Sequence, residues 1–359
     1  MADTSEGNSA SGDDAITIAI DAMGGDQAPA QVVSAVARLS CEDPGGRRVY
    51  FALVGDEAAL TEHLLSESHN PERIHIRHAP SAVAMSEPAR GALEEKPDSS
   101  IAIACRLCAA DQADAVVTAG HPGAAVLTAA STFERIPGVD RAALASVYPT
   151  PRERGTERDP FSLLLDVGAS LRADADDLVT YALMGSAYAT IVSGNERPRV
   201  ALLSTSREPI HGVEEVREAY ERLREHPDVH FYGNIQGHEI PHGVVDVVVC
   251  EGFVGDVVIK ILEGVGDAAF ELARSAYHRK LIWKVGLRLL SGGLSQLKQL
   301  TDFEQYGGAP LLGIDRVMIL AHPRSQQTAI ANAIKLAIKN VRADLPSAIA
   351  RSLESMPAN

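Results

Sequence analysis

Hydrophobic residues follow two alternating patterns along the chain. Short runs rich in Val, Ile and Leu predict β-strands, and longer segments with apolar residues three or four positions apart predict helices. Strands are expected at Ile16–Ile20, Val49–Val54, Ile74–His78, Ala115–Thr118, Ala143–Val147, Leu163–Asp166, Val200–Ser204, Val229–Tyr232, Val245–Cys250 and Arg316–Leu320. Helices are expected at Ala28–Ser40, Ala58–Ser66, Ser99–Ala110, Gly123–Arg135, Asp174–Ser193, Val213–Arg224, Gly255–Tyr277, Arg279–Leu290 and Gln326–Ala343. The alternation indicates an α/β fold, with a mostly parallel sheet covered by helices on both faces.

The predicted elements divide the chain into three parts. Residues 15–343 are expected to form the α/β domain, and residues 344–359 a C-terminal helix and tail. Residues 1–14 are small, polar and acidic, which predicts a disordered tail without the basic and apolar regions of a signal peptide. No apolar run is long enough to span a bilayer, so a cytoplasmic protein is expected. Charged residues with Gly and Pro between Arg152 and Pro160 predict an exposed loop or hairpin tip.

Composition narrows the classes of function. The net charge of −15 disfavours a nucleic-acid partner, because an acidic surface repels phosphates. Aromatic residues make up only 4% of the chain, so Ala, Val and Leu must fill the interior, as in a helix-flanked parallel sheet. Neither a P-loop pattern nor a GxGxxG after a strand occurs, and no cofactor is expected.

Cys105 and Cys108 form a CxxC motif within the predicted helix Ser99–Ala110. They are either a redox or metal pair, or two small apolar residues of the helix. No second CxxC and no Cys/His pair lies at zinc spacing, which favours the apolar interpretation, and no metal site is expected. In the cytoplasm the four cysteines are expected to be reduced.

Glycine-rich loops adjoin many of the predicted strands. Ligands of open α/β sheets bind at the carboxyl ends of strands, and glycines let backbone N–H groups approach an anion closely. The candidate substrate- or phosphate-binding residues lie in these loops and in the loop after Val200–Ser204, and they are Asp21, Gly24, Gly25, Asp26, Gly120, Gly123, Asp166, Gly168, Ser170, Glu208, Gly252, Arg324 and Ser325. One such loop is an ordinary turn, but several together indicate a single site suited to phosphate or an acyl phosphate.

The sequence of these loops resembles the phosphate acyltransferases of bacterial phospholipid synthesis. The most specific matches are Asp-Ala-Met-Gly-Gly-Asp at 21–26 and Tyr-Gly-Gly-Ala at 306–309. Further matches include Leu-Val-Gly-Asp at 53–56, Asp-Val-Gly-Ala at 166–169 and Gly-Phe-Val-Gly at 252–255. The resemblance extends from Ile16 to about Ala343.

The resemblance implies a three-layer fold of the isocitrate dehydrogenase and phosphotransacetylase group, with a protruding helical hairpin, and a homodimer. It implies that inorganic phosphate attacks the thioester of an acylated acyl carrier protein, giving acyl phosphate and the free carrier. It also implies a cytoplasmic enzyme that lodges on the inner membrane surface through the hairpin. No protein nucleophile is needed, and no GxSxG occurs.

The chain departs from the family's usual sequence at several of these loops. His121 and Pro122 replace Asn and Thr, Ser170 replaces Asn, His211 replaces the Lys that follows Glu208, Asp256 replaces Asn, and Leu320, Pro323 and Arg324 replace Lys, Gly and Ser. A site that loses lysines and gains carboxylates binds a dianion less well, although Arg324 can restore one positive charge.

Three interpretations follow from these departures. The chain is an ordinary phosphate acyltransferase with substituted ligands, a diverged acyltransferase or thioesterase-like enzyme with another acceptor, or a non-catalytic relative that binds acyl carrier protein. His121 and His211 are either acid–base groups or, respectively, a loop cap and an exposed silent residue. His322 matches a histidine of the family, and the three histidines are the candidate catalytic residues.

A basic segment lies between Arg274 and Lys298, where no Asp or Glu occurs. Its candidate contact residues are Arg279, Lys280, Trp283, Lys284 and Arg288, interleaved with leucines. Such a segment in an acidic protein suits docking of the acidic acyl carrier protein or contact with an anionic membrane. The structural alternative is a hairpin that packs in a dimer and exposes its basic face.

Overall fold

The computed structural model describes residues 15–42, 48–279 and 307–354. These residues form an eleven-stranded sheet with the order β3-β2-β1-β4-β11-β10-β5-β6-β9-β7-β8. The strands are β1 Ile16–Asp21, β2 Val49–Gly55, β3 Ile74–His78, β4 Ala115–Thr118, β5 Ala143–Arg154, β6 Asp159–Leu165, β7 Arg199–Leu203, β8 His230–Ile235, β9 Val247–Val249, β10 Ala309–Leu312 and β11 Val317–Leu320.

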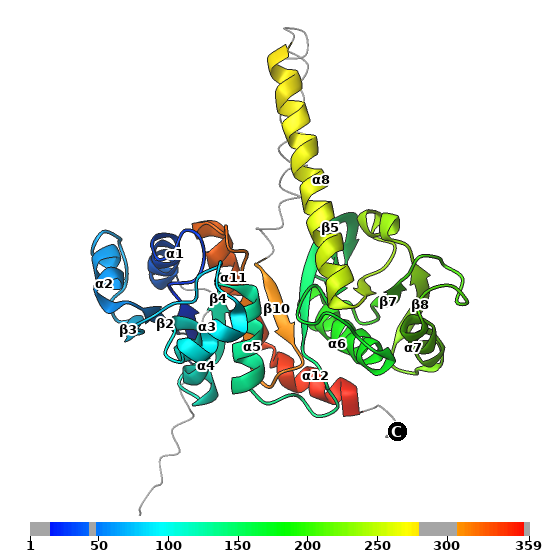
Figure 1. The fold of residues 1–359 in the computed structure, drawn as a ribbon, viewed down its shortest axis with the longest axis horizontal. Helices are drawn as coiled ribbons and strands as arrows, with labels where there is room; N and C mark the ends of the chain where they lie inside the picture. The colour runs from blue at the N-terminus through cyan, green and yellow to red at the C-terminus, as the bar shows by residue number, and fades with distance from the viewer. Residues whose placement is uncertain (1–14, 43–47, 280–306, 355–359) are drawn as a thin grey trace, which may run out of the picture.

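Helices cover both faces of this sheet (Figure 1). They are α1 Ala30–Cys41, α2 Glu57–Leu65, α3 Ala89–Glu95, α4 Ser100–Ala109, α5 Pro122–Thr132, α6 Ala175–Ser193, α7 Glu214–Glu225, the 3₁₀ helix η1 Gly237–His242, α8 Gly252–Arg279, α11 Gln327–Arg342 and α12 Leu345–Glu354. Successive residues of a strand point to opposite faces. On β1, Ile18 and Ile20 pack with α1 and α11, whereas Ala19 packs with α4.

The sheet consists of two parallel blocks that run in opposite directions. Strands β1, β2, β3, β4 and β11 form the first block, and β6, β7, β8 and β9 form the second. Among the described strands, antiparallel pairing occurs only between β11, β10, β5 and β6, at the junction of the blocks. The prediction of a mostly parallel sheet flanked by helices is confirmed. Each block with its helices is called a lobe below.

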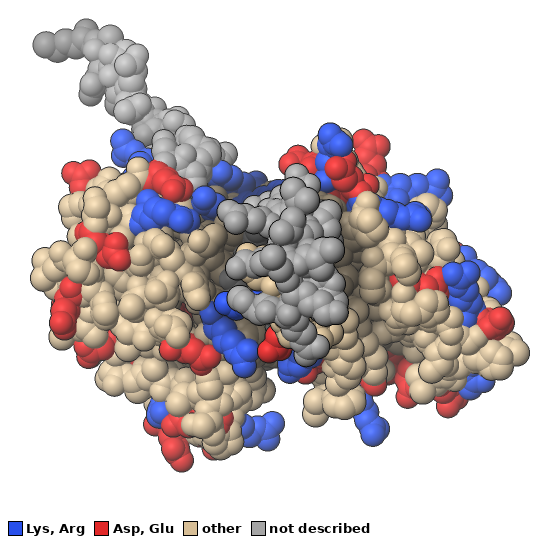
Figure 2. Space-filling model, turned by 90° about the horizontal axis from the view of Figure 1, so that it is seen from above, with Lys and Arg blue, Asp and Glu red and all other residues tan. Residues whose placement is uncertain are grey.

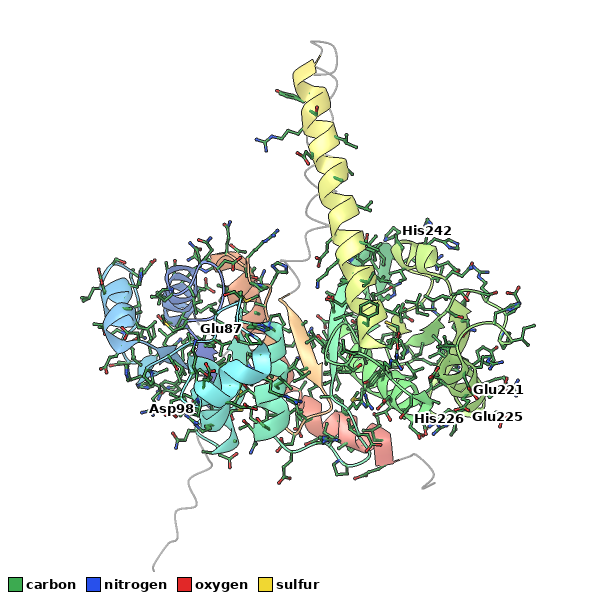
Figure 3. The ribbon with its side chains drawn as sticks, in the orientation of Figure 1. Glu87, Asp98, Glu221, Glu225, His226 and His242 are labelled. Carbon is green, nitrogen blue, oxygen red and sulfur yellow. The ribbon has the colours of Figure 1, made fainter. Side chains whose placement is uncertain are left out.

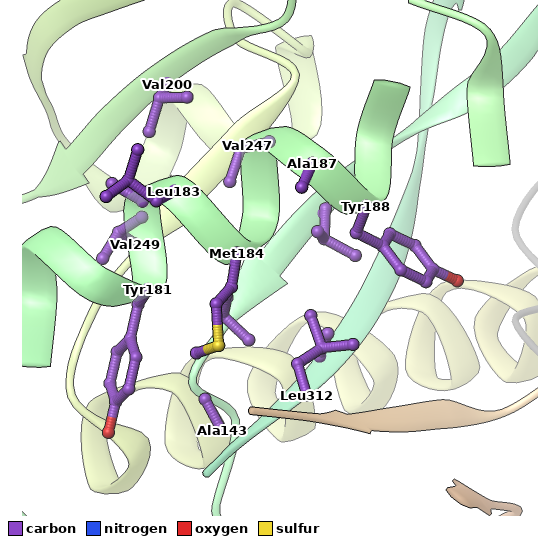
Figure 4. Packing of buried hydrophobic residues seen from close by; sticks show 14 of the residues in the cluster. Ala143, Tyr181, Leu183, Met184, Ala187, Tyr188, Val200, Val247, Val249 and Leu312 are labelled. Carbon is purple, nitrogen blue, oxygen red and sulfur yellow. The ribbon is translucent and has the colours of Figure 1, made fainter. Parts of the chain in front are cut away.

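Helix α6 forms the centre of the second lobe. Asp174 and Asp177 form a reciprocal capping box at its start, and Gly194 ends it in the left-handed conformation. Tyr181, Met184 and Tyr188 are buried against the strands, as Figure 4 shows. Helix α12 packs on α6 and adds Leu345, Ile349 and Leu353 to the same core.

The structure differs from the sequence prediction at two places and agrees with it at a third. Strand β10, which includes Pro310, is not among the predicted strands. The charged segment Arg152–Pro160 is the tip of a hairpin, one of the two predicted alternatives, because β5 continues to Arg154 and β6 begins at Asp159. Helix α8 runs without interruption from Gly252 to Arg279 and projects from the body of the molecule (Figure 1).

Most of the predicted basic segment lies outside the described residues, as do Lys280, Trp283, Lys284 and Arg288 and the predicted tail at 1–14. Arg279 is the last residue of α8. None of the described helices is both long enough and apolar enough to cross a membrane.

Candidate active site

A cavity of about 510 Å³ lies where the two lobes meet. Its walls come from β11, β10 and β5, from the loops after β11 and β6, and from the first three turns of α8. Figure 2, viewed onto the face from which α8 projects, shows acidic and basic side chains on both lobes beside the hollow between them. The cavity therefore lies at the junction of the blocks, where strand direction changes.

Most of the cavity wall is apolar. The apolar side chains are those of Met85, Pro122, Leu144, Val147, Val167, Leu171, Phe253, Ile259, Ala309, Leu320, Ala321, Pro323 and Ala329. An apolar enclosure with few polar groups favours a ligand that carries a hydrocarbon part.

Polar groups of the cavity gather around the loops that the sequence analysis singled out. Gly168, Ser170, Gly252, His322 and Ser325 all line it. Ser325 is almost completely buried, whereas His322 is exposed. Five of the predicted site residues are thus brought to one cavity, and they come from both lobes.

The loops after β1, β4 and β11 pack tightly together beside this cavity. Asp26 donates its backbone N–H to the carbonyl oxygen of Pro323 at 2.8 Å. A Cβ atom at Gly24 would lie 2.7 Å from the backbone nitrogen of Gly120, so only glycine permits this approach. Gly25 lies in the loop after β1, and Gly123 lies in the first turn of α5. These residues shape the backbone that carries His322.

Asp21 is buried beneath these loops. Its Oδ2 accepts a hydrogen bond from the hydroxyl of Thr118 at 2.7 Å, and that hydroxyl accepts the N–H of Gly120 at 2.9 Å. Burial raises the pKa of Asp21. Asp21, Gly24 and His121 line a much smaller cavity of about 10 Å³ instead of the main one. The structure therefore gives Asp21 the task of holding the loop after β4.

Asp166 likewise organises the backbone. Its Oδ1 accepts the N–H groups of Leu144, Gly168 and Ala169, and its Oδ2 accepts that of Ser170 at 2.7 Å. Asp166 is completely buried and does not line the cavity. It was expected to bind phosphate, but its lone pairs are occupied by the loop that it shapes.

His322 has a defined tautomer. Its Nδ1 accepts the backbone N–H of Arg324 at 3.1 Å, so the ring proton of the neutral imidazole is on Nε2. Although the residue as a whole is exposed, desolvation of the ring and, after it, the charge of Arg324 lower the pKa of His322, which favours the neutral ring. A neutral Nε2–H group is a hydrogen-bond donor.

His121 also accepts a backbone N–H at its Nδ1. As the N-cap of α5, it accepts the N–H of Ala124 at Nδ1, at 3.3 Å. This hydrogen bond agrees with the loop-cap alternative for His121, and its neighbour Pro122 lines the main cavity. Because Nδ1 of His121 accepts this hydrogen bond, that nitrogen is not available to act as a base.

The loop after β7 lies away from the cavity. His211 and Glu208 are exposed there, and neither lines a cavity that includes His322. Glu208 instead accepts a hydrogen bond from the hydroxyl of Ser206, which lowers the pKa of its carboxyl. Arg324 is exposed and also lies outside the cavity wall. The structure thus does not bring His211 and Arg324 to a common anion site.

Lys96 and Glu87 form an ion pair on the first lobe. The Lys96 Nζ lies 2.6 Å from Oε1 of Glu87 and also donates to the carbonyl oxygen of Ala82. Figure 3 labels Glu87 on the first lobe and Glu221, Glu225 and His226 at the far side of the second lobe. The Lys96 ammonium is therefore committed to Glu87 and not to the cavity.

Charged residues of α8 line the cavity but were not among the predicted site residues. Asp256, Lys260 and Glu263 are three or four positions apart, which places them on one face of the helix. Lys260 forms an ion pair with Asp256, from Nζ to Oδ2 at 2.7 Å. Charged residues at helical spacing, in a helix that begins directly after the end of β9, were the sequence feature that could have identified them.

The CxxC cysteines are packed in the core. Cys105 and Cys108 are fully buried, and burial raises the pKa of both thiols, that of Cys108 to about 12. Among the described residues no cluster of His, Cys, Asp and Glu could hold a metal ion. The apolar interpretation agrees with this burial.

We expect only one thiol of the native protein to react with iodoacetamide at pH 8. Cys41 is exposed, whereas Cys105, Cys108 and Cys250 are buried. Intact-mass measurement should show one adduct in buffer, none in Cys41→Ser, and four in denaturant. Rapid labelling of Cys105 or Cys108 in the folded protein would contradict this packing.

Comparison with protein families gives one match that spans the chain. The family model described as "Fatty acid synthesis protein" matches residues 16–348. A phosphate acyltransferase of Desulfitobacterium hafniense strain Y51 is 39% identical over 338 residues, covering 92% of this chain and 97% of the relative. The phosphate acyltransferase of Thermoanaerobacter pseudethanolicus is 37% identical, covering 94% and 98% of the two chains.

Solved structures of phosphotransacetylases have a similar fold. The phosphotransacetylase of Streptococcus pyogenes superimposes with a TM-score of 0.63, at 16% identity, covering 91% of this chain and 94% of that one. The EutD phosphotransacetylase of Staphylococcus aureus gives a TM-score of 0.55 at 15% identity, covering 96% and 95%. The expected fold of the phosphotransacetylase group is thereby confirmed.

Proposed function

Since this chain belongs to the fatty acid synthesis protein family and is an acyltransferase, we propose that it transfers a fatty acyl group from the thioester of acyl carrier protein to inorganic phosphate. Phosphate is the acceptor named for its curated relatives, at 37–39% identity over nearly their full length. The product would be an acyl phosphate for phospholipid synthesis, made by a cytoplasmic enzyme.

The observation that carries this proposal is the composition of the cavity. Its apolar wall suits a hydrocarbon chain, and its polar groups lie at the loops after β6 and β11 and on α8, where the thioester carbonyl would be held. Gly252 begins α8 and lines the cavity, and the first N–H groups of a helix favour an anion.

The reaction needs no protein nucleophile. A phosphate oxygen of HPO₄²⁻ attacks the carbonyl carbon, and the thioester C=O becomes an oxyanion. Collapse of that intermediate breaks the C–S bond, and the proton of the phosphate passes to the departing thiolate, leaving acyl phosphate and the carrier thiol. The protein has to position the two reactants and donate hydrogen bonds to the oxyanion.

We assign the oxyanion donor to His322. Its Nε2–H is fixed by the hydrogen bond that Nδ1 accepts from Arg324, and its lowered pKa keeps it neutral. A neutral donor stabilises an oxyanion without binding phosphate as a counter-ion. His121 would support the neighbouring loop through its cap on α5, and His211 would have no role in the reaction.

The basic segment from Arg274 to Lys298 would dock acyl carrier protein or contact the inner membrane surface. Helix α8, which leads into it, exposes Ile261, Val265 and Leu272, all more than half exposed. Apolar side chains in such a row favour a partner surface, as in the proposed homodimer. Lys280→Glu with Lys284→Glu should weaken binding of the carrier or of anionic liposomes.

Hydroxylamine trapping tests the proposed reaction. Purified enzyme and acyl-acyl carrier protein should yield acyl hydroxamate only when phosphate is present. Equal loss of thioester with and without phosphate would instead show another acceptor, with water as the simplest. Replacing the carrier with a free acyl-pantetheine thioester measures how much of the rate depends on docking.

A further inference from the structure

We propose that Asp256 sets the affinity of this enzyme for phosphate. Its carboxylate pairs with the Lys260 ammonium at the cavity and so competes with phosphate for that positive charge. The inference rests on the proposed function, because phosphate is the acceptor concerned. Asp256 stands where the resemblance implies Asn, so this chain carries a negative charge at that position.

The ion pair is part of the cavity wall. Asp256 and Lys260 both line the cavity, and the pair spans one turn of α8 with Nζ and Oδ2 2.7 Å apart. Asp256 lies beside the loop after β6, since a Cβ atom at Gly168 would be 3.7 Å from its Oδ1. The pair therefore faces the loop after β6, which lines the same cavity.

Lys260 also lies within electrostatic reach of the candidate oxyanion donor, because its charge contributes to lowering the pKa of His322. Arg324 does not line the cavity. Lys260 is thus the lysine or arginine of the described cavity wall that can attract phosphate directly.

The carboxylate of Asp256 opposes that attraction in two ways. It occupies a donor of the ammonium group, and it repels a dianion that approaches Lys260. Asn has nearly the same size but no charge, so Asp256→Asn removes both effects and leaves the helix and the cavity shape in place. Coulomb interactions across a few ångströms at a protein surface are large enough to change affinity several-fold.

The test compares the KM for phosphate in single and double variants of the full-length enzyme. Asp256→Asn should lower the KM for phosphate about five- to tenfold, with kcat changed less than about twofold. Lys260→Met should raise that KM about tenfold. In the Lys260→Met background, Asp256→Asn should lose most of its effect, because its benefit acts through the ammonium group.

Glu271→Gln is the matched control. It removes one negative charge from the same helix at an exposed position outside the cavity wall, and its KM should equal that of the wild type. Isothermal titration of inorganic phosphate into the wild type and Asp256→Asn gives a second measurement that does not need turnover. Tighter phosphate binding by Asp256→Asn supports the inference.

The outcomes separate the inference from the proposed function. If the wild type makes acyl phosphate but Asp256→Asn leaves both KM and phosphate binding unchanged or weaker, the inference is overturned and the proposed function stands. If Glu271→Gln lowers the KM as much, the effect belongs to net charge and the inference is again overturned. Absence of acyl phosphate from the wild type would overturn the proposed function, whereas titration would still decide the role of Asp256.

Discussion

Replacing His322 with alanine should lower kcat for acyl transfer about 100- to 1,000-fold, as loss of one oxyanion donor does in other acyl-transfer enzymes. The imidazole is neutral, with its proton on Nε2, and it lines the cavity. Alanine removes the donor without disturbing the hydrophobic wall, so the KM for the acyl thioester should change little. Steady-state kinetics with acyl-acyl carrier protein and saturating phosphate measure both constants.

His322→Gln separates hydrogen-bond donation from acid–base chemistry. The glutamine amide retains an N–H donor but cannot take up a proton near neutral pH, so this variant should keep about one tenth of the wild-type kcat. His211→Ala is the control, with less than a twofold expected change because His211 lies outside the cavity. If His322→Gln were as inactive as His322→Ala while both fold, a proton-transfer role would replace the donor role.

Gly255→Ala should lower the free energy of unfolding by about 3 kcal/mol or more, the upper range for overpacking a tight contact. A Cβ atom at Gly255 would lie 1.9 Å from the backbone oxygen of Asp166, which cannot move aside as a flexible side chain can. The start of α8 would therefore have to move away from the loop after β6. Urea denaturation followed by circular dichroism measures this loss.

Gly264→Ala provides a control within the same helix. No atom lies within 4 Å of a Cβ at Gly264, and alanine favours a helix interior over glycine by about 1 kcal/mol. This variant should be as stable as the wild type or slightly more so. Equal stability of Gly255→Ala and the wild type would show that α8 and the loop after β6 do not pack as closely as described.

Local signals in the sequence were sufficient for several elements. Helix α6 was expected at Asp174–Ser193 and is observed at Ala175–Ser193, because a capping box starts it and Gly194 ends it. Strand β10 could not be expected in the same way. It has four residues, one of them Pro310, and exists through pairing with β11 and β5, which long-range folding brings beside it.

The part of the site that lies in loops at strand ends was predictable from the sequence. The strand-end argument found His322, Ser325, Gly168, Ser170 and Gly252, all of which line the cavity. It misplaced His211, because β9 and β6 lie between β7 and the junction of the blocks, a strand order that the sequence does not display.

Lys260 and Asp256 show the opposite limit. They lie within a helix rather than in a loop, and they reach the cavity because α8 starts at its wall. Asp166 shows another limit of prediction from the sequence, because an aspartate at a strand end suggested a group that binds the substrate. Only the structure shows that four backbone N–H groups occupy its oxygens. Residue type and position alone do not distinguish these tasks.

The most direct test of the central claim is a phosphorus NMR spectrum of the enzyme with acyl-acyl carrier protein and inorganic phosphate. Transfer to phosphate predicts a new acyl-phosphate resonance that grows in step with the free carrier thiol, one for one, and at the expense of inorganic phosphate. Release of the carrier thiol with the phosphate resonance unchanged would contradict the account, because the acyl group would then have gone to a different acceptor.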